Sequence, residues 1–529
     1  MRPLELVIPT LLAIYLLVPT PRPLTIRMFP IGALFLVFIH FFIEGYRWQM
    51  IPIYALALIL TTTIFLSWDV KPAISYLTLI LLAISTAIPI LLPVPSIPTP
   101  SGSYQVGTRI YELTDSARRE VYSGKDEPRR FSIQIWYPSE ISPSDERASW
   151  MAKAKIFAPA IAMQIGMPSF FLDHLALAKI PAYKESTVAS SDQAYPVILF
   201  SHGWNGFNAQ NTSQALELAS HGYIVIGIQH TYGAVITVFN DGTVSKNNPS
   251  ALPAGALTEE YETAAHILSD QWSGDMGFTL DFMRLQNNDP KSPFHALVDF
   301  ERVGVYGHST GGGAAIEFCG TDTRCKSLLG MDPFMRPVSY EVIATGVPQP
   351  SFFMFSQRWI DDVESRNNEL FHKFYPNVTE PVGVISIDGT SHYDFADLPL
   401  LSPLAPQLGL KGPINGKRVT TIINDYLLSF FNMTLKGETT GLFEYQSEKY
   451  IEVKIIQSEK QHGYKACIGI KPCGRIRNGC TQRSGAHAGT ARTGVRAGKR
   501  QLGLGWRGFR NRPGCRGSYG QERYRKLPA

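Results

Sequence analysis

Hydrophobic and polar positions divide this chain into two parts of different character. Four apolar segments with few charges open the sequence, at residues 4–19, 29–42, 51–68 and 73–92. A helix that crosses a bilayer needs roughly 17–25 predominantly apolar residues, and four such segments in succession leave no polar face for water. We therefore expect residues 1–92 to form an α-helical membrane domain with about four transmembrane helices.

Beyond a proline-rich linker at residues 93–104, the pattern becomes that of a soluble α/β domain within residues 105–457. Strands are predicted at short apolar or alternating runs, namely 109–113, 131–137, 196–200, 223–228, 302–306, 327–331, 351–355 and 382–387. Helical periodicity separates most of them, with a long helix at 259–285 and a closing helix at 419–435. Strands that alternate with helices predict a mostly parallel sheet. Residues 139–190 interrupt the strand series and are expected to cover the active site.

Charge is distributed unevenly along the chain. The formal net charge is +5, yet residues 461–529 hold 16 Lys and Arg residues and a single acid, Glu522. The rest of the chain is therefore acidic, and no nucleic-acid partner is expected from the total. The tail at 458–529 is dense in Gly and Arg and is predicted to be disordered. A basic lipid- or RNA-binding segment and a non-native extension are its alternatives, and the lack of RGG repeats favours the extension.

The strongest chemical signal is a serine at a sharp turn between a strand and a helix. The strand at 302–306 leads into Gly-His-Ser-Thr-Gly-Gly-Gly at 307–313, and helical residues follow. Such a serine, here Ser309, is the nucleophile elbow of an α/β-hydrolase. A second strand, at 196–200, is followed by His202-Gly203, where this fold builds half of its oxyanion hole. The expected fold is an α/β-hydrolase sheet with helices on both faces, preceded by the α-helical transmembrane domain.

A nucleophilic serine needs a histidine base, which in this fold comes last in the chain order Ser, Asp or Glu, His. His392 lies in a Gly-Thr-Ser loop directly after the strand at 382–387, a position that suits a catalytic base. His372 is the nearest competitor, but it lies in a polar helical stretch and is expected to be solvated. The sequence therefore favours His392.

The acid that orients this histidine has two candidate positions. Asp332 follows the strand at 327–331 directly, and Pro333 fixes the direction in which the chain leaves it. Asp361 and Asp362 come after the next strand, where many α/β-hydrolases keep their acid, but they stand among charged residues typical of a solvated helix start. These considerations favour Asp332.

Several of these segments together resemble plasma-type platelet-activating factor acetylhydrolases. The resemblance covers roughly residues 105–435 and rests on the motif at 307–312, Asp332 with its aromatic neighbour, the stretch 389–397 and the segments 202–203 and 218–225. It implies Ser309 as nucleophile, Asp332 as acid and His392 as base. It also implies that the backbone N–H groups of Trp204 and Thr310 form the oxyanion hole.

The resemblance extends to the expected substrate and location. It implies a serine esterase that hydrolyses short acyl esters of phospholipids and uses neither cofactor nor metal. The apolar segments with residues 44–50 are similar to membrane-anchored microbial members, whereas the secreted animal enzymes lack such a block. Residues 229–231, Gln-His-Thr, stand where those enzymes carry a charged segment, so their substrate range does not transfer directly.

Two other functions compete with this one. The Gly-His-Ser-x-Gly-Gly-Gly form also resembles cutinase-like polyester hydrolases, which place the acid near Asp361, and a general carboxylesterase would share the same triad. A membrane scaffold or sensor with an inactive hydrolase fold is the non-enzyme alternative. The expected partners are an ester substrate and a membrane, and the oligomeric state is left open.

The charges between the apolar segments predict the orientation in the membrane. Arg22, Arg27 and Lys71 lie in the first and third loops, and Arg2 and Arg47 lie at the opposite ends of the segments. The positive-inside rule then places the first and third loops in the cytoplasm and the catalytic domain on the extracytoplasmic side.

The six cysteines contain no Cys-x-x-Cys pair, so their spacing predicts neither a zinc site nor a disulfide framework. Cys319 and Cys325 are expected to be buried thiols that behave as small apolar side chains.

Overall fold

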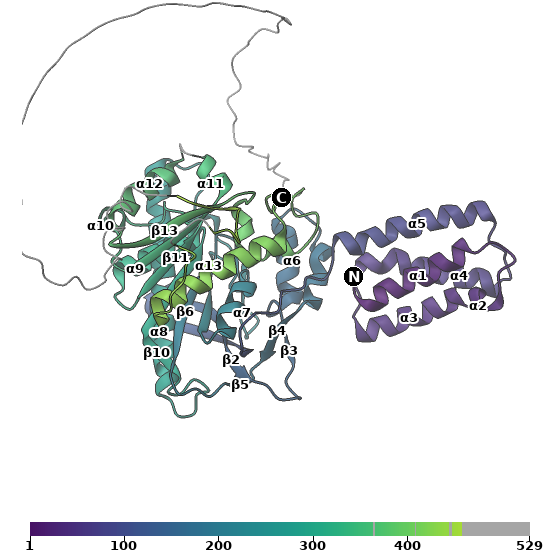
Figure 1. The fold of residues 1–529 in the computed structure, drawn as a ribbon, viewed down its shortest axis with the longest axis horizontal. Helices are drawn as coiled ribbons and strands as arrows, with labels where there is room; N and C mark the ends of the chain where they lie inside the picture. The colour runs from purple at the N-terminus through teal and green to yellow at the C-terminus, as the bar shows by residue number, and fades with distance from the viewer. Residues whose placement is uncertain (363–364, 408, 444–446, 457–529) are drawn as a thin grey trace, which may run out of the picture. The chain divides into compact units, whose positions relative to one another are not determined.

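The computed structural model describes residues 1–362, 365–407, 409–443 and 447–456 (Figure 1). The tail at 458–529, which the sequence predicts to be disordered, lies outside the described residues. The N-terminal helices are α1 (Pro3–Leu17), α2 (Leu24–Arg27), α3 (Phe29–Ile43), α4 (Ile51–Phe65) and α5 (Pro72–Leu91). Three stretches are long and apolar enough to cross a membrane, namely Leu24–Ile43, Trp48–Phe65 and Pro72–Leu91. The first apolar segment falls short of that length, because α1 has only 15 residues.

Charged side chains gather at one end of these helices. Glu5, His40 and Glu44 place their ligand atoms within 4.8 Å of one another, a grouping of metal-binding residue types that the sequence did not suggest. Arg2 and Arg47 each approach a Glu5 carboxylate oxygen to 2.7 Å. Their guanidinium groups supply the positive charge that a cation would bring, so the cluster is an ion-pair network.

The described residues beyond α5 are built on a 12-stranded mixed sheet. Its strands are β1 (Gln105–Arg119), β2 (Pro128–Glu140), β3 (Arg147–Ser149), β4 (Lys179–Lys184), β5 (Thr187–Val188), β6 (Tyr195–Ser201), β7 (Ile224–Gln229), β10 (Val298–His308), β11 (Ser327–Met331), β12 (Pro350–Ser356), β13 (Glu380–Ile387) and β14 (Val453–Ile455). The order is β14-β13-β12-β11-β10-β6-β7-β2-β1-β4-β3, with β5 paired to β2. The six strands from β13 to β7 run parallel to one another. Their carboxyl ends therefore meet at one edge of the sheet.

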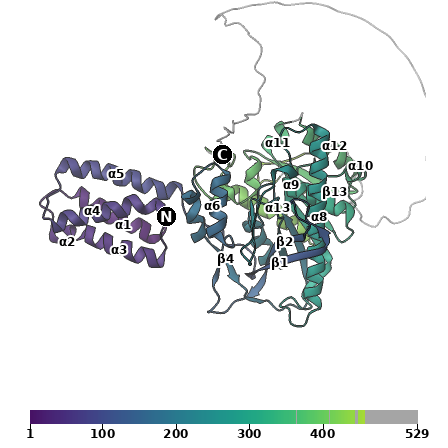
Figure 2. The ribbon, with the colours of Figure 1, turned by 180° about the vertical axis from the view of Figure 1, so that it is seen from behind.

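Helices cover both faces of this sheet (Figures 1 and 2). They are α7 (Thr212–Ser220), α8 (Thr258–Asn288), α9 (Thr310–Thr321), α10 (Tyr340–Thr345), α11 (Gln357–Asp361), α12 (Arg366–Phe374) and α13 (Gly416–Lys436). Alternate residues of one strand enter opposite cores, as side chains of a pleated strand must. In β6, Ile198 and Phe200 pack in the core that holds α7 and α13, whereas Val197 and Leu199 pack in the core that holds α8 and α9.

The segment at 139–190, which the sequence marked as an interruption of the strand series, contains helical and strand elements. The helical elements are α6 (Ala154–Gln164) and the 3₁₀ stretch η2 (Ser169–Leu177), and the strands are β3, β4 and β5. These strands extend the sheet beyond β1 or pair with the end of β2. They are two to six residues long, too short to give a reliable alternation in the sequence. Other short elements are β8 (Ile236–Val238), β9 (Val244–Lys246), η1 (Trp48–Met50), η3 (Pro249–Ala251), η4 (Tyr375–Asn377), η5 (His392–Phe395) and η6 (Leu398–Leu400).

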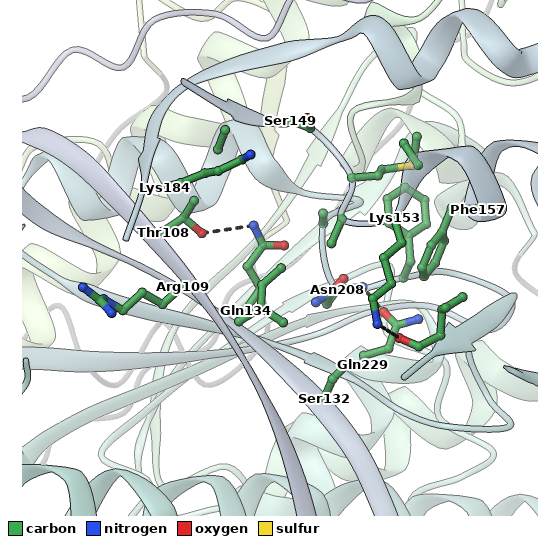
Figure 3. A pocket seen from close by; sticks show the side chains of 18 of the residues that line it. Thr108, Arg109, Ser132, Gln134, Ser149, Lys153, Phe157, Lys184, Asn208 and Gln229 are labelled. Carbon is green, nitrogen blue, oxygen red and sulfur yellow. Dashed lines mark hydrogen bonds between the residues drawn. The ribbon is translucent and has the colours of Figure 1, made fainter. Parts of the chain in front are cut away.

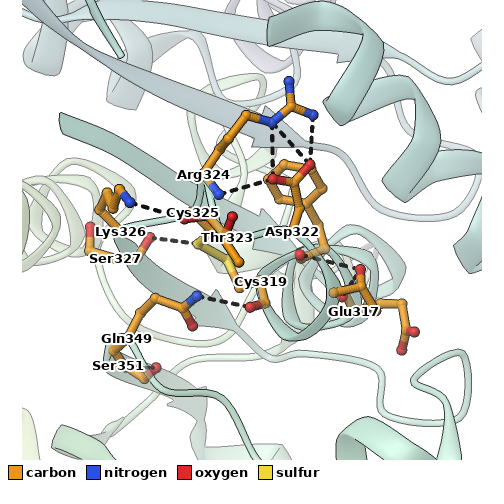
Figure 4. Close-up of a disulfide and its surroundings, with 12 residues drawn as sticks. Glu317, Cys319, Asp322, Thr323, Arg324, Cys325, Lys326, Ser327, Gln349 and Ser351 are labelled. Atoms are coloured by element: carbon orange, nitrogen blue, oxygen red, sulfur yellow. Dashed lines mark hydrogen bonds and ion pairs between the residues drawn. A yellow bond between two sulfur atoms is a disulfide. The ribbon is translucent and has the colours of Figure 1, made fainter. Parts of the chain in front are cut away.

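The expectation of free thiols at Cys319 and Cys325 was wrong. The two residues form a disulfide across the connection from α9 to β11, with Cα atoms 5.2 Å apart (Figure 4). Both are buried, as expected. The Gln349 side chain donates a hydrogen bond of 2.9 Å to the Cys319 carbonyl, which ties this joint to the residue before β12. A spacing of six residues is compatible with many loop shapes, so only the fold of the loop reveals the pair.

Candidate active site

Ser309 lies at the turn between β10 and α9, where the sequence places it. Its backbone has φ 56° and ψ −123°, a strained conformation for a residue with a side chain. The Ser309 N–H donates to the Met331 carbonyl at 3.0 Å, and this bond ties the turn to the end of β11. A Cβ atom at Gly311 would lie 2.2 Å from the Ser201 carbonyl oxygen. Glycine at that position therefore lets the start of α9 approach the end of β6 closely.

Asp332 follows β11 and also has a left-handed backbone, with φ 40°. Its side chain is buried at 1 % exposure. One carboxylate oxygen accepts the Ser356 N–H at 2.7 Å, and the other accepts the Ser356 hydroxyl at 2.6 Å. These bonds from the end of β12 fix the carboxylate in one orientation.

The structure brings His392 and Asp332 together. His392 Nδ1 lies 3.0 Å from Asp332 Oδ2, while the imidazole keeps 36 % of its surface exposed. The His392 carbonyl contacts His308 Nε2 at 2.9 Å, and the two rings lie 4.6 Å apart. Because Nδ1 faces the carboxylate, Nε2 is the nitrogen left to accept a proton. Among the described residues, no hydrogen bond joins the Ser309 hydroxyl to His392, a looseness common in unliganded hydrolases.

The competing candidates lie elsewhere. Asp361 and Asp362 are exposed, at the end of α11 and just beyond it. His372 is exposed on α12, as expected. The acid that faces His392 is therefore Asp332.

The two backbone groups expected to form an oxyanion hole flank Ser309. Thr310 is the first residue of α9, so its N–H lies at the positive end of that helix. Trp204 follows Gly203, and a Cβ at Gly203 would lie 3.2 Å from the Ser309 Cβ. The Gly206 N–H closes this loop onto the Gly203 carbonyl at 2.9 Å. Both N–H groups therefore belong to segments packed beside the serine.

A buried network behind this loop was missed by the sequence analysis. His230 Nε2 lies 3.0 Å from Ser201 Oγ, and His230 Nδ1 lies 3.0 Å from Asp275 Oδ2. The His230 N–H donates to His202 Nε2 at 3.2 Å, and His202 Nδ1 contacts the Gly203 carbonyl at 2.7 Å. This chain of hydrogen bonds connects α8, β7 and β6 to the segment that carries the predicted oxyanion donor.

The buried charges in this network are paired with each other. Arg129 and Asp275 are fully buried, and two guanidinium nitrogens contact the carboxylate at 3.0 and 2.7 Å. Burial opposes ionisation of Asp275, but the Arg129 charge and the His230 hydrogen bond outweigh it and lower the pKa of the carboxyl. Burial lowers the pKa of His202 to about 3, so its imidazole is neutral at pH 7. His230 was noticed in the sequence only as part of Gln229-His230-Thr231, because its partners come from distant elements.

The family model of platelet-activating factor acetylhydrolase, isoform II, matches residues 93–273 and 258–441. The chain belongs to this family. The match confirms the resemblance predicted from the sequence motifs.

Similar acetylhydrolases and esterases are found in animals, fungi and bacteria. The platelet-activating factor acetylhydrolase of Cavia porcellus is 27% identical over 64% of this chain and 78% of its own length. A probable 1-alkyl-2-acetylglycerophosphocholine esterase of Arthroderma benhamiae is 25% identical over 68% of this chain and 92% of its own length. A ferulic acid esterase from Streptomyces cinnamoneus shares the fold, with a TM-score of 0.58 and 22% identity over 69% of this chain and all of its own. This member of the acetylhydrolase family is accordingly a carboxylic ester hydrolase.

Proposed function

We propose that this protein is a serine esterase that hydrolyses short acyl esters of phospholipids at a membrane surface. The observation that carries the proposal is the 3.0 Å contact between His392 Nδ1 and Asp332 Oδ2, beside a serine at a strained strand-to-helix turn. Family membership supports the substrate class, because similar proteins are named for acetyl esters of glycerophosphocholine.

In the proposed mechanism Ser309 Oγ attacks the carbonyl carbon of the ester while His392 Nε2 takes the hydroxyl proton. Collapse of the tetrahedral intermediate breaks the bond to the alcohol oxygen, and His392 returns the proton to that leaving group. A water molecule then attacks the acyl-enzyme with His392 as base, which releases the carboxylic acid and restores Ser309. Asp332 holds the imidazole in the required tautomer and stabilises the imidazolium.

The negative charge of the tetrahedral intermediate develops on the former carbonyl oxygen. In the proposal it is stabilised by the backbone N–H groups of Thr310 and Trp204, and each such donor contributes about 3–4 kcal/mol in comparable sites. No step in this mechanism calls for a metal or an organic cofactor, since the protein supplies the nucleophile, the base and the hydrogen-bond donors to the oxyanion.

We also propose that residues 1–92 anchor the enzyme in a membrane, with 93–104 as a linker and 105–457 as the catalytic domain. Three helical stretches of suitable length and hydropathy support this anchor. Arg22 and Lys71 lie just before the apolar helices α2–α3 and α5, whereas Arg2 and Arg47 are paired with Glu5 and Glu44. Positive charge available to lipid headgroups is thus at the loops before α2 and α5, which favours an extracytoplasmic catalytic domain.

The enzymatic proposal is tested with a fluorophosphonate probe and a substrate panel. Wild-type protein should bind the probe covalently and hydrolyse a short-chain phospholipid ester, and Ser309→Ala should do neither. Equal labelling of both proteins would contradict a nucleophilic Ser309. Labelling without phospholipid turnover, but with turnover of polyester films or nitrophenyl esters, would favour the cutinase-like or general esterase alternative. No labelling and no turnover would favour an inactive scaffold.

The anchor is tested separately by fractionation. The full chain should remain with membranes after an alkaline carbonate wash, whereas a fragment of residues 101–457 should be soluble and active on short esters. Recovery of the full chain in the soluble fraction without detergent would contradict the membrane domain and leave the triad untouched.

A further inference from the structure

A pocket of about 980 Å³ lies between the sheet and the segment that covers it (Figure 3). Its floor is formed by β1, β2 and the end of β7, and its roof by residues 148–157 around the start of α6. Five alanines line it, and their small side chains leave the space open: Ala148, Ala152, Ala154, Ala176 and Ala209. The volume is in the range of small-molecule sites.

The floor of this pocket is polar where a sheet face beneath a cover is ordinarily apolar. Ser132 and Gln134 of β2 point into the pocket, while the alternate residues Ile133 and Ile135 enter the opposite core. Ser132 stands opposite Gln229 of β7 in the strand register, and Gln229 also lines the pocket. A row of hydroxyl and amide groups on adjacent strands is a surface suited to several hydrogen bonds at once.

One group in this row has no partner. Gln134 is only 2 % exposed, and its Nε2 donates to the Thr108 hydroxyl at 3.1 Å. Its Oε1 is buried and accepts no hydrogen bond within the described residues. Figure 3 shows the amide between the Thr108 hydroxyl and the interior of the pocket, with the oxygen turned away from Thr108. A buried carbonyl without a donor is unfavourable, so a ligand that donates there would be stabilised.

The charges around the pocket are balanced, which argues against an ionic ligand. Its lining contains four cationic and four anionic side chains: Arg109, Lys153, Lys155, Lys184, Glu112, Asp145, Glu146 and Glu185. Lys184 approaches Glu146 to 3.4 Å and Lys153 approaches Glu112 to 3.7 Å. Paired charges leave no net field to hold a phosphate or an ammonium group.

We propose that this pocket binds a neutral polyhydroxylated group, such as a sugar or polyol. Hydroxyl groups donate and accept, so they satisfy an amide turned either way and also pair with Ser132 and Thr108. The C–H faces of such a group pack against Phe157 and Phe207, which line the opposite wall. A choline head has no N–H or O–H to offer to Gln134 Oε1.

The position of the pocket connects it to ester hydrolysis. Phe207–Ala209 follow directly on the loop that carries the predicted oxyanion donor, and β2 is three strands from β10 in the sheet. At about 4.8 Å per strand, the floor lies roughly 14 Å from the strand that carries Ser309. The group bound there is a neutral polyol head of the phospholipid substrate, beyond its phosphate. This assignment to the substrate rests on the proposed esterase function, whereas the binding itself does not.

The binding test uses full-length Ser309→Ala protein in a detergent without a sugar head. Maltose, glycerol, phosphocholine and inorganic phosphate are titrated by calorimetry. Maltose should bind saturably, and neither phosphocholine nor phosphate should. Gln134→Leu should weaken maltose binding about tenfold, the effect of losing one hydrogen bond in a buried site. Gln164→Leu, on the exposed side of α6, should bind like the parent.

Several outcomes would overturn the proposal: no saturable binding of maltose or glycerol, equal binding by Gln134→Leu, or binding of phosphocholine alone. If Gln134→Leu fails to fold, Ala152→Phe fills the pocket from its partly exposed rim and should abolish maltose binding. A second arm compares acetyl esters with sugar and choline heads on wild-type enzyme. Faster turnover of the ester with the sugar head, together with a smaller preference in Gln134→Leu, would show that the pocket binds the head group of the substrate. Maltose binding without any ester turnover would defeat the esterase proposal and leave the pocket assignment intact.

Discussion

Ser309 and Asp332 share an uncommon property, which is a left-handed backbone in a residue with a side chain. Both residues end a strand of the parallel sheet, and the Ser309 N–H donates to the carbonyl of Met331, the residue before Asp332. Each side chain is thus aimed by a backbone conformation that adjacent strands hold in place. Such strain persists only where the surroundings determine it.

Replacement of the orienting acid tests the assignment of Asp332. Asp332→Asn should lower kcat by about 10⁴-fold, because the amide favours the wrong imidazole tautomer. Asp361→Asn and Asp362→Asn alter exposed side chains around the end of α11 and should leave kcat near the wild-type value. Steady-state turnover of a nitrophenyl ester separates these outcomes. If either control variant abolished turnover while Asp332→Asn retained it, the acid would have been assigned to the wrong strand.

Removal of a buried charge tests the network behind the loop that carries the predicted oxyanion donor. Asp275→Asn removes one of the two carboxylates that contact the fully buried Arg129 guanidinium and leaves Glu120 as the other. We therefore expect a cost of about 3 kcal/mol, the lower end of the range for a broken buried pair. Asp281→Asn, on the same helix, removes an exposed pair with Arg324 and should cost less than about 1 kcal/mol. Thermal unfolding of both variants beside wild type measures the difference. Similar midpoints for the two variants would mean that the buried pair adds nothing.

The positions of Ser309, Asp332 and His392 in the fold could be predicted, because each residue follows a strand at a recognisable motif. The partners of His230 could not be predicted in the same way. Ser201 lies on β6 and Asp275 on α8, while Arg129, which pairs with Asp275, lies on β2. No spacing in the sequence relates these residues. The role of Gln134 could not be predicted either, because only the fold shows that its side chain lines a cavity.

At the scale of elements, close approach between α9 and β6 shapes the turn that holds the serine. Gly311→Ala would place a Cβ 2.2 Å from the Ser201 carbonyl oxygen, so the helix start must shift. We expect a loss of about 1–3 kcal/mol in stability and a larger loss of turnover, because the same shift moves the Thr310 N–H. Gly441→Ala meets no atom within 4 Å and should be neutral in both respects. Turnover and melting temperature are measured for both variants. A Gly311→Ala enzyme with wild-type turnover would contradict the need for a glycine where α9 meets β6.

The prediction of the elements themselves succeeded where burial is continuous. The strand predicted at 327–331 has those bounds in the structure, because β11 is buried along its whole length. The strand predicted at 109–113 extends to Gln105–Arg119, because residues on both sides of the predicted run also pair with β2, and those beyond Leu113 do so at largely exposed, polar positions. Apolar periodicity reports burial, so it does not predict the parts of a strand that pair at exposed positions.

At the scale of the whole molecule, buried histidines make stability depend on pH. Burial lowers the pKa of His202 to about 3, and burial also lowers the pKa values of His308 and His230. Below pH 6.5 these histidines bind protons in the unfolded chain but stay neutral in the folded state. Their contribution to stability is therefore present above pH 6.5 and is lost as the pH falls towards 3.

Carboxyls whose pKa is raised by burial oppose this trend, and Asp397 does so most strongly. Burial raises the pKa of Asp397 to about 7, so the folded state holds a proton that the unfolded chain releases above about pH 4. The buried histidines should outweigh these carboxyls, so the free energy of unfolding should fall as the pH is lowered from 6.5 to 4.5. Urea midpoints at these two pH values provide the measurement. A midpoint that is constant or rises on acidification would contradict the neutral, buried state of these imidazoles.

The disulfide between Cys319 and Cys325 also carries information about cellular compartment. Disulfides persist in oxidising surroundings and are reduced in the cytosol, so the covalent state of this pair tests the proposed extracytoplasmic location of the catalytic domain. In protein whose thiols are alkylated at the moment of lysis, the peptide that spans both cysteines should carry no alkyl group until a reductant is added. Two alkylated cysteines at lysis would instead indicate a cytosolic catalytic domain.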